Sequence, residues 1–253
     1  MTLRDAWDAE AERWIAWARR PGHDSYWRFH RDAFLASLPP PPARVLDVGC
    51  GEGRLPRDLK QRGYEVIGLD GSPTLVAAAA EADPTGRYLL GDAQALPFDD
   101  KAFDLVTAFM SLQDVDDPEA AVREIHRVLI PGGRVRSAVV HPINSAGGFE
   151  AGPVTAAPPT PATRNVREDD APFVIRESYF DERIYVDTIE RDDLPMTFTS
   201  HHRPVERWIR AFLEAGFRLD HVAEIPDASA PAGSRWQRIP LFLHIGGQKR
   251  EGP

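Results

Sequence analysis

The chain has 253 residues, of which 42% are hydrophobic and 27% are charged, so it can bury a core of ordinary size. This length suits a single α/β domain, and the composition excludes a chain that is mainly disordered or coiled-coil. The formal net charge is -9 and no run of Lys or Arg interrupts it, which argues against a nucleic-acid partner and against an anionic membrane surface.

Cysteine usage and hydropathy indicate a cytoplasmic protein. The chain has one cysteine, Cys50, so no disulfide can form within it and a cysteine-based zinc site is disfavoured. No stretch approaches the roughly 18 apolar residues of a membrane-spanning helix. Residues 1–20 carry charges throughout, unlike the apolar core of a signal peptide. Arginine far outnumbers lysine, which fits a bacterial genome rich in G and C.

The first 42 residues predict a helical cap. Residues 5–19 carry three tryptophans among charges and predict one amphipathic helix. A turn at Pro21-Gly22 precedes a second helix over about 25–38. The prolines of 39–42 end that helix and act as a stiff spacer before the main domain at 43–253.

The main domain begins with strands that alternate with helices. Strands are predicted at 44–48, 65–69, 86–90, 103–109 and 134–140, with helices at 54–62, 73–81 and 118–129. This alternation is typical of βαβ units and therefore of a parallel sheet.

The pattern changes after residue 141. Residues 146–171 are rich in Pro, Ala, Gly and Thr, which predicts a long loop. Two strands at about 175–190 and 196–199, a helix at 203–215 and two final strands at 217–224 and 239–245 complete the chain. We therefore predict an α/β fold: a Rossmann-like, seven-stranded, mostly parallel sheet with its last strand antiparallel and helices on both faces. The helical cap precedes it, and a β lid at about 142–202 follows its fifth strand.

The most informative motif is VLDVGCGEGR at residues 45–54. An apolar strand runs through Asp47 into Gly49, Gly51 and Gly53, and a helix follows. Glycines allow positive φ angles and close approach of a ligand, and a helix N-terminus adds unpaired N–H groups. In an open α/β sheet, ligands bind beyond the carboxyl ends of the strands. The motif is thus the predicted ligand-binding turn.

The motif differs from both phosphate-binding patterns. A dinucleotide fingerprint has G-x-G-x-x-G, but Arg54 stands at the third glycine position. A P-loop has G-K-[ST], which is also absent. Asp70 ends the second strand, where an acid can accept hydrogen bonds from ribose hydroxyls, and Asp92 ends the third, where it can take an adenine amino group. The pattern indicates a nucleoside without phosphates.

Four motifs in order, VLDVGCGEG at 45–53, VIGLDGSP at 66–73, GDAQALPF at 91–98 and REIHRVLIPGGR at 123–134, resemble the class I S-adenosylmethionine-dependent methyltransferases. The chain is most similar to the type 11 group, which includes the ubiquinone/menaquinone-biosynthesis methyltransferases. The resemblance covers about 45–140 and implies S-adenosyl-L-methionine as the cofactor.

The resemblance also implies residue roles. Asp47 would lie near the methionine amino group, the backbone of Gly49, Gly51 and Gly53 would hold methionine and ribose, and Asp70 would take the ribose hydroxyls. Gly71 and Ser72 would lie beside the adenine edge, Asp92 and Ala93 would bind adenine, and Phe109 and Met110 would form the wall near the sulfonium. Cys50 would be a small buried residue of the turn, because neighbouring backbone and acids do not favour a thiolate.

One departure concerns the proton acceptor. Many family members carry a histidine pair or His-Trp just after the fourth strand, but here the stretch 111–115 is SLQDV. A base, if the acceptor needs one, must come from Asp114 or elsewhere. Other candidates are Tyr26 in the cap, His141 after the fifth strand, and His202 before the last long helix. Each of these also has an ordinary structural interpretation.

Other polar and aromatic patterns in the sequence have structural rather than functional interpretations. His201 and His202 lie near acidic residues, but adjacent side chains point apart on a helix or a strand, so we expect no metal site. Asp187, Glu190 and their acidic neighbours are expected to form a solvated face. Likewise, the cap tryptophans at helical spacing are more often core than substrate cage.

The sequence therefore predicts a bacterial methyltransferase that acts on an oxygen, nitrogen or carbon of a small molecule, for example in secondary metabolism, as a monomer or homodimer. Two alternatives stay open. One is an NAD(P)-dependent oxidoreductase, and the other is a non-catalytic protein that binds S-adenosylmethionine and scaffolds a partner.

Overall fold

The computed structural model describes residues 2–150 and 170–251. Most of the predicted loop at 146–171 lies outside these residues. The described part is built on a central sheet with the order β10-β11-β5-β4-β1-β2-β3. Its strands are β1 Arg44–Val48, β2 Glu65–Asp70, β3 Arg87–Leu90, β4 Phe103–Phe109, β5 Leu129–Val140, β10 Phe217–Ile225 and β11 Phe242–Lys249.

The strand directions agree with the predicted fold. β1 pairs in parallel with β2 and β4, and β2 with β3 and β4 with β5 are also parallel. β11 alone runs antiparallel, to both β5 and β10. The prediction of a seven-stranded, mostly parallel sheet with its last strand antiparallel is confirmed. That last strand begins at Phe242 rather than at 239.

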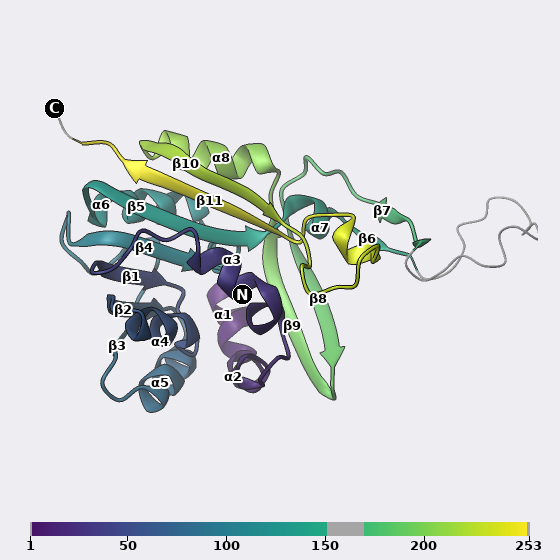
Figure 1. Ribbon diagram of the computed structural model, residues 1–253, viewed down its shortest axis with the longest axis horizontal. Helices are drawn as coiled ribbons and strands as arrows, with labels where there is room; N and C mark the ends of the chain where they lie inside the picture. Colours follow the sequence, from purple (N-terminus) through teal and green to yellow (C-terminus); the bar gives the residue numbers. More distant parts are fainter. Residues whose placement is uncertain (1, 151–169, 252–253) are drawn as a thin grey trace, which may run out of the picture.

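Helices cover the sheet on two sides (Figure 1). They are α4 Arg54–Gln61, α5 Pro73–Ala82, α6 Pro118–Val128 and α8 Val205–Glu214. Successive residues of a strand point to opposite faces, so Leu46 of β1 joins a core with α6 and α8, while Val45 joins a second core with α4 and with α3, which spans Arg31–Leu35. Because both faces are buried, the inner strands are almost continuously apolar.

The predicted cap is helical but more broken than expected. The single helix at 5–19 is two helices, α1 Leu3–Ala9 and α2 Ala11–Arg19, because the N–H of Glu10 turns back to the carbonyl of Trp7 and closes α1. The second helix starts as a π-helical turn, Tyr26–His30, before α3 Arg31–Leu35.

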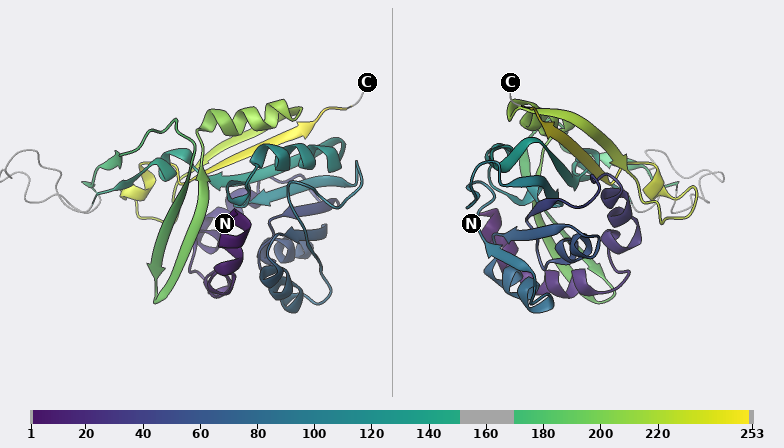
Figure 2. Two further views of the ribbon diagram at one scale, coloured as in Figure 1. Left: turned by 180° about the vertical axis from the view of Figure 1, so that it is seen from behind. Right: turned by 60° about the vertical axis from the view of Figure 1, so that its left-hand side comes forward.

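The segment after β5 forms a long hairpin beside the cap. α7 Pro142–Ala146 is followed by β6 Gly147–Phe149, which pairs with β7 Phe173–Ile175. β8 Arg183–Arg191 and β9 Leu194–His202 then pair antiparallel through a two-residue turn, at which Asp192 and Asp193 have positive φ. Both α1 and α2 contact β9, and the views from both sides show the hairpin beside these helices (Figure 2).

One strand prediction in this segment is wrong. Residues 175–190 are not a single strand, because β7 ends at Ile175 and β8 begins at Arg183. Between them the Ser178 hydroxyl accepts the N–H of Phe180, and its carbonyl accepts that of Asp181. Serine favours such turns, and here it interrupts the extended pattern.

Among the helices of 2–150 and 170–251, none has the length and apolar character that crossing a membrane requires.

Candidate functional site

The glycine turn after β1 is shaped by three positive φ angles. They are +72° at Gly49, +56° at Gly51 and +85° at Gly53, and Gly53 is the N-cap of α4. The N–H groups of Gly49 and Cys50 donate to the carbonyl of Leu69 at 2.7 and 3.0 Å, which ties the turn to the end of β2. A Cβ on Gly49 would lie 2.2 Å from the Cβ of Ser111, so only glycine fits.

A cavity of about 1070 Å³ opens at this turn. It is bounded by the carboxyl ends of the central strands, by the cap and by the β8–β9 hairpin. The predicted cofactor residues lie in its wall, with the exception of Gly53: Asp47, Gly49, Cys50, Gly51, Asp70, Gly71, Ser72, Asp92, Ala93, Phe109 and Met110. The structure thus brings together residues from four strand ends that are far apart in the sequence.

Asp70 braces the glycine turn and still faces the cavity. Its Oδ2 accepts the N–H of Gly51 at 2.8 Å and its Oδ1 accepts that of Ser72 at 2.9 Å. Burial raises the pKa of Asp70, and these backbone bonds oppose the rise. A carboxylate offers about four lone-pair sites, so two hydroxyl donors can still bind it. At the next strand end, the Oδ1 of Asp92 accepts the backbone N–H of Gln94 at 2.8 Å.

Asp47 is the other acid beneath the turn, and it is 2% exposed. Its Oδ1 accepts the hydroxyl of Thr107 at 2.7 Å. Burial raises the pKa of Asp47 to about 7, with the charge of Asp70 adding to the rise and the Thr107 bond opposing it. The free site therefore holds an acid that is charged only at some energetic cost.

Cys50 lies in the same turn as a buried thiol. Burial raises its pKa well above the usual range, and the charges of Asp70 and Asp47 add to this. The thiolate is thus strongly disfavoured, which agrees with a packing role rather than a nucleophilic one.

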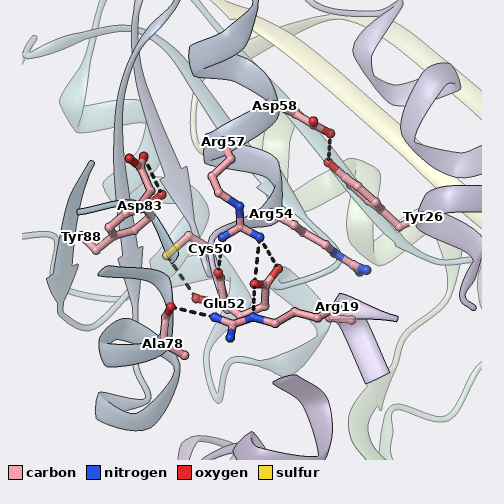
Figure 3. Close-up of polar contacts among 12 residues, drawn as sticks. Arg19, Tyr26, Cys50, Glu52, Arg54, Arg57, Asp58, Ala78, Asp83 and Tyr88 are labelled. Atoms are coloured by element: carbon pink, nitrogen blue, oxygen red, sulfur yellow. Dashed lines mark hydrogen bonds and ion pairs between the residues drawn. The ribbon is translucent and has the colours of Figure 1, made fainter. Parts of the chain in front are cut away.

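Glu52 links the turn to the cap, and sequence reasoning missed it. It is 1% exposed, and its carboxylate pairs with Arg57 of α4 at 2.8 Å and with Arg19 of α2 at 3.0 Å. Arg19 also donates to the carbonyl of Ala78 at 2.8 Å. Figure 3 shows both guanidinium groups converging on Glu52. Its place between two glycines was a signal, but the partner 33 residues away was not visible in the sequence.

Arg54 also joins the turn to the cap. Its side chain pairs with Asp24 at 2.6 Å, and its guanidinium lies over the rings of Trp14 at 4.9 Å and Tyr26 at 4.3 Å. At the position of the missing third glycine, the chain therefore carries a cation that points into the cavity wall.

Three of the four catalytic candidates lie outside the cavity wall. The Tyr26 hydroxyl donates to Asp58 at 2.6 Å (Figure 3), and burial raises its pKa above the usual range. The Nδ1 of His141 accepts the N–H of Ile143 and caps α7, while its Nε2 contacts Glu224 at 3.0 Å. The two ring nitrogens of His202 contact Ser145 and the carbonyl of Tyr179.

Asp114 is the candidate that does line the cavity. It follows β4 in the short 3₁₀ turn Leu112–Asp114. Its Oδ1 accepts the hydroxyl of Ser200 on β9 at 2.5 Å, and its Oδ2 accepts the amide of Gln113 at 3.1 Å. Burial raises the pKa of Asp114 well above the usual range, and these hydrogen bonds oppose the rise.

Aromatic rings form the wall between the cap and the hairpin. Phe198 of β9 packs edge-on against Trp7, Trp14 and Trp17, with ring centroids 6.0 to 6.2 Å apart. All four rings line the cavity, so the cap tryptophans are both packed and cavity-facing. Trp27, at 41% exposure, does not line it.

The hairpin supplies polar residues that the sequence did not single out. Tyr185 and Asp187 of β8 and Ser200 of β9 line the cavity. Asp187 was expected on a solvated acidic face; it is exposed, and its side of the hairpin also borders the cavity. Tyr185 lies opposite Ser200, which donates to Asp114, and Asp187 follows two residues later on the same face of β8, so these three groups are neighbours. Burial raises the pKa of Tyr185, and the charges of Asp114 and Asp187 both add to the rise.

No group of three or more His, Cys, Asp or Glu side chains in the described part of the chain is arranged to hold a metal ion.

The comparisons with known proteins agree with this geometry. Residues 46–136 match the family model described as a methyltransferase domain. A demethylmenaquinone methyltransferase from Thermus thermophilus is 43% identical over 45% of this chain and 54% of its own length. A malonyl-[acyl-carrier protein] O-methyltransferase from Enterobacter lignolyticus is 38% identical over 44% of this chain and 45% of its own length.

A solved S-adenosylmethionine-dependent methyltransferase from Mesorhizobium loti has a TM-score of 0.70 and 26% identity, covering 89% of this chain and 98% of its own. The comparisons confirm the resemblance found in the motifs: residues 46–136 match a methyltransferase domain, and the fold is similar to that of a solved S-adenosylmethionine-dependent methyltransferase. The chain spans about half the length of the curated relatives it matches.

Proposed function

We propose that this chain is a methyltransferase that uses S-adenosyl-L-methionine to methylate a small-molecule acceptor. One observation carries the proposal: the cavity joins a positive-φ glycine turn to Asp47, Asp70 and Asp92 at successive strand ends. Among the described residues of its wall there is no lysine. This lining suits a cationic nucleoside and is unfavourable for a pyrophosphate.

The residues present fit that cofactor. A Cβ at Gly49 would lie 2.2 Å from another atom and a Cβ at Gly53 would lie 3.0 Å from one, so neither position of the turn accepts a side chain. The turn would hold the methionine and ribose portions, with the amino group at Asp47 and the ribose hydroxyls at Asp70. Asp92 and Ala93 would take the adenine, and Phe109 and Met110 would form the wall near the sulfonium.

Methyl transfer requires mainly that the acceptor atom be aligned with the methyl group. When bound, the cofactor supplies an electrophilic methyl group attached to a good leaving group. The protein must hold the acceptor atom in line behind that methyl, and positioning of this kind contributes up to roughly 7–11 kcal/mol. The cap and hairpin aromatics line the cavity on the side away from the strand ends. Ligand sites usually measure roughly 300–1,000 Å³, so a cavity of about 1070 Å³ has room for both cofactor and acceptor.

Of the four catalytic candidates predicted from the sequence, we assign a role in turnover to Asp114 and not to Tyr26, His141 or His202. Asp114 lines the cavity, whereas the other three have their polar atoms engaged outside its wall. Asp114→Asn is expected to lower turnover with cofactor affinity kept, and His141→Ala to lower thermal stability more than turnover. A large loss of turnover in His141→Ala alone would reverse the assignment.

Binding experiments test the cofactor. S-adenosylhomocysteine should raise the melting temperature and NADH should not, because a ligand that binds the native state stabilises it. Asp70→Ala should weaken S-adenosylmethionine at least tenfold by calorimetry, since a hydrogen bond to a charged group contributes roughly 1.5–3 kcal/mol. A shift with NADH alone would favour the oxidoreductase alternative. Cofactor binding without turnover on any acceptor would favour the scaffold alternative.

We further propose a bacterial, cytoplasmic enzyme that acts as a monomer or homodimer without a nucleic-acid or membrane partner. The net charge of -9 supports the absence of both partners. The curated relatives named above come from bacteria. Light scattering would determine the oligomeric state.

A further inference from the structure

The part of the cavity beyond the strand ends is walled by the cap and the hairpin. Trp7, Trp14 and Trp17 come from the cap, and Phe198 lies among them. This part is the space left for the acceptor, because the predicted cofactor residues lie at the strand ends. An aromatic wall of this kind favours an acceptor with an apolar, ring-sized body.

The charges of the cavity wall are unbalanced. Each of its four arginines already has a partner: Arg4 donates to the carbonyl of Gly91, Arg28 pairs with Asp227, Arg54 pairs with Asp24, and Arg191 donates to the carbonyl of His23. Arg4 and Arg191 keep their positive charge, because a carbonyl does not neutralise a guanidinium, but the described wall carries ten carboxyl groups against these four arginines. A carboxylate or phosphate group on the acceptor would therefore meet an excess of acidic groups there.

Unlike the arginines of the cavity wall, Asp187 has no partner among the described residues. Within the described residues, this cavity-lining carboxylate has no hydrogen bond and no ion pair. It lies on β8 opposite Phe198, two residues from Tyr185. It is thus a free negative charge at the border of the aromatic cluster. Asp187 is exposed to solvent as well as lining the cavity, and its partial burial raises its pKa, so it is also a better proton acceptor than a fully solvated aspartate.

We propose that the acceptor is an amine on an aromatic or similarly apolar body, and that Asp187 binds its ammonium group. This inference rests on the proposed methyltransferase function and names its substrate class. An ammonium ion gains an ion pair with Asp187 and a favourable position over the neighbouring ring faces.

The same placement gives a balanced reaction. The ammonium N–H proton moves to the Asp187 carboxylate, which leaves a lone pair on nitrogen. That lone pair forms the new N–CH₃ bond while the S–CH₃ bond breaks and its electron pair stays on sulfur. The products are the methylated ammonium and S-adenosylhomocysteine, and the proton on Asp187 passes to solvent. No oxidant, reductant or metal is needed.

The experiment compares three probes of matched size on protein saturated with S-adenosylhomocysteine: 2-phenylethylamine, 2-phenylethanol and 3-phenylpropionate. We expect calorimetry to show the amine binding at least tenfold more tightly than the alcohol, and the carboxylate most weakly. Equal affinities, or a preference for the carboxylate or the alcohol, would overturn the amine proposal.

Two variants locate the contact. Asp187→Asn keeps the side-chain size and removes the charge, so it should abolish the preference for the amine and leave S-adenosylhomocysteine affinity unchanged. Glu190→Gln is the matched control, because Glu190 is exposed on the same strand and lies outside the cavity wall. If Asp187→Asn keeps the amine preference, Asp187 is not the binding group.

The outcomes separate this inference from the function beneath it. Failure of the wild-type protein to bind S-adenosylhomocysteine would refute the proposed function itself. Normal cofactor binding without an amine preference would refute only the substrate class. Transfer of a labelled methyl group to 2-phenylethylamine, lowered at least tenfold in kcat/KM by Asp187→Asn, is the expected result in a turnover assay.

Discussion

Replacing Asp47 by asparagine should stabilise the protein without ligand and weaken its cofactor binding. The carboxyl is 2% exposed, and burial raises its pKa from the usual 3.8 to about 7. A group whose pKa is raised on folding costs stability as the pH rises from its unfolded pKa to its folded one. Each pKa unit corresponds to about 1.36 kcal/mol. The charged form therefore costs about 4 kcal/mol above pH 7, by this arithmetic.

Asparagine removes this cost and keeps the Oδ1 that accepts the Thr107 hydroxyl. We expect the free energy of unfolding of Asp47→Asn to exceed that of the wild type by about 2 kcal/mol at pH 5 and by about 4 kcal/mol at pH 8. For a chain of this size, 4 kcal/mol corresponds to roughly 10 °C in melting temperature. Thermal and urea unfolding at both pH values measure the difference.

Binding of S-adenosylmethionine should favour the wild type over the variant. An ammonium group beside Asp47 favours its charged form, so the variant should bind S-adenosylmethionine at least tenfold more weakly. Asp99→Asn, at an exposed loop position, is the control for a lost surface charge. A variant no more stable than wild type at pH 8, or a gain that does not change with pH, would refute the electrostatic argument. Unchanged cofactor affinity would refute the role given to Asp47.

Two further perturbations probe the turn and its link to the cap. The Gly49→Ala variant should unfold at a much lower urea concentration than the Gly22→Ala variant. Both positions have φ near +70°. An added Cβ would lie 2.2 Å from another side chain at Gly49, but would have no atom within 4 Å at Gly22. We expect a loss of more than about 3 kcal/mol against about 1 kcal/mol, and equal losses would contradict the steric argument. Arg19→Ala should cost about 1–2 kcal/mol because it removes a hydrogen bond to the buried Glu52, whereas Arg13→Ala, which removes an exposed ion pair, should cost under about 0.5 kcal/mol. An effect of Arg19→Ala no larger than that of Arg13→Ala would show that the cap is not held through Glu52.

The glycine turn could be predicted from the sequence because its determinants are local. Gly49 and Gly51 follow β1 directly, and Asp70 closes the next strand, so their meeting point follows from the topology of a parallel sheet. The strand–helix alternation had the same local basis, and the mostly parallel sheet that it predicted is confirmed.

The acceptor side could not be predicted in this way, because its contacts join distant segments. Ser200 donates to Asp114 across 86 residues, and Trp7 donates to the carbonyl of Thr199 across 192 residues. Alternating polar and apolar residues predicted strands near 175–199 but did not say which face of β8 meets the cap. The sequence therefore predicted that Asp187 is exposed, which it is, but not that its face of the strand also borders the cavity.

His141 illustrates how contacts made by a side chain can argue against a role suggested by its position. A histidine just past the fifth strand is placed at the active end of the sheet, which made it a reasonable base from position alone. Position does not reveal competition for its nitrogens, and here the helix that starts at Pro142 takes the Nδ1 as a cap. A side chain that satisfies a helix N-terminus cannot also present that nitrogen to a substrate.

The acids beneath the glycine turn give the binding site its ligand dependence. Asp47 and Asp70 are both buried, and the charge of Asp70 raises the pKa of Asp47, so the two carboxylates oppose each other's ionisation in the free protein. A cation placed between them removes that opposition, whereas an anion increases it. The energy that burial costs the free turn is therefore recovered when a cationic ligand binds. For this reason the same two residues that lower the stability of the free protein should raise its affinity and selectivity for a positively charged nucleoside.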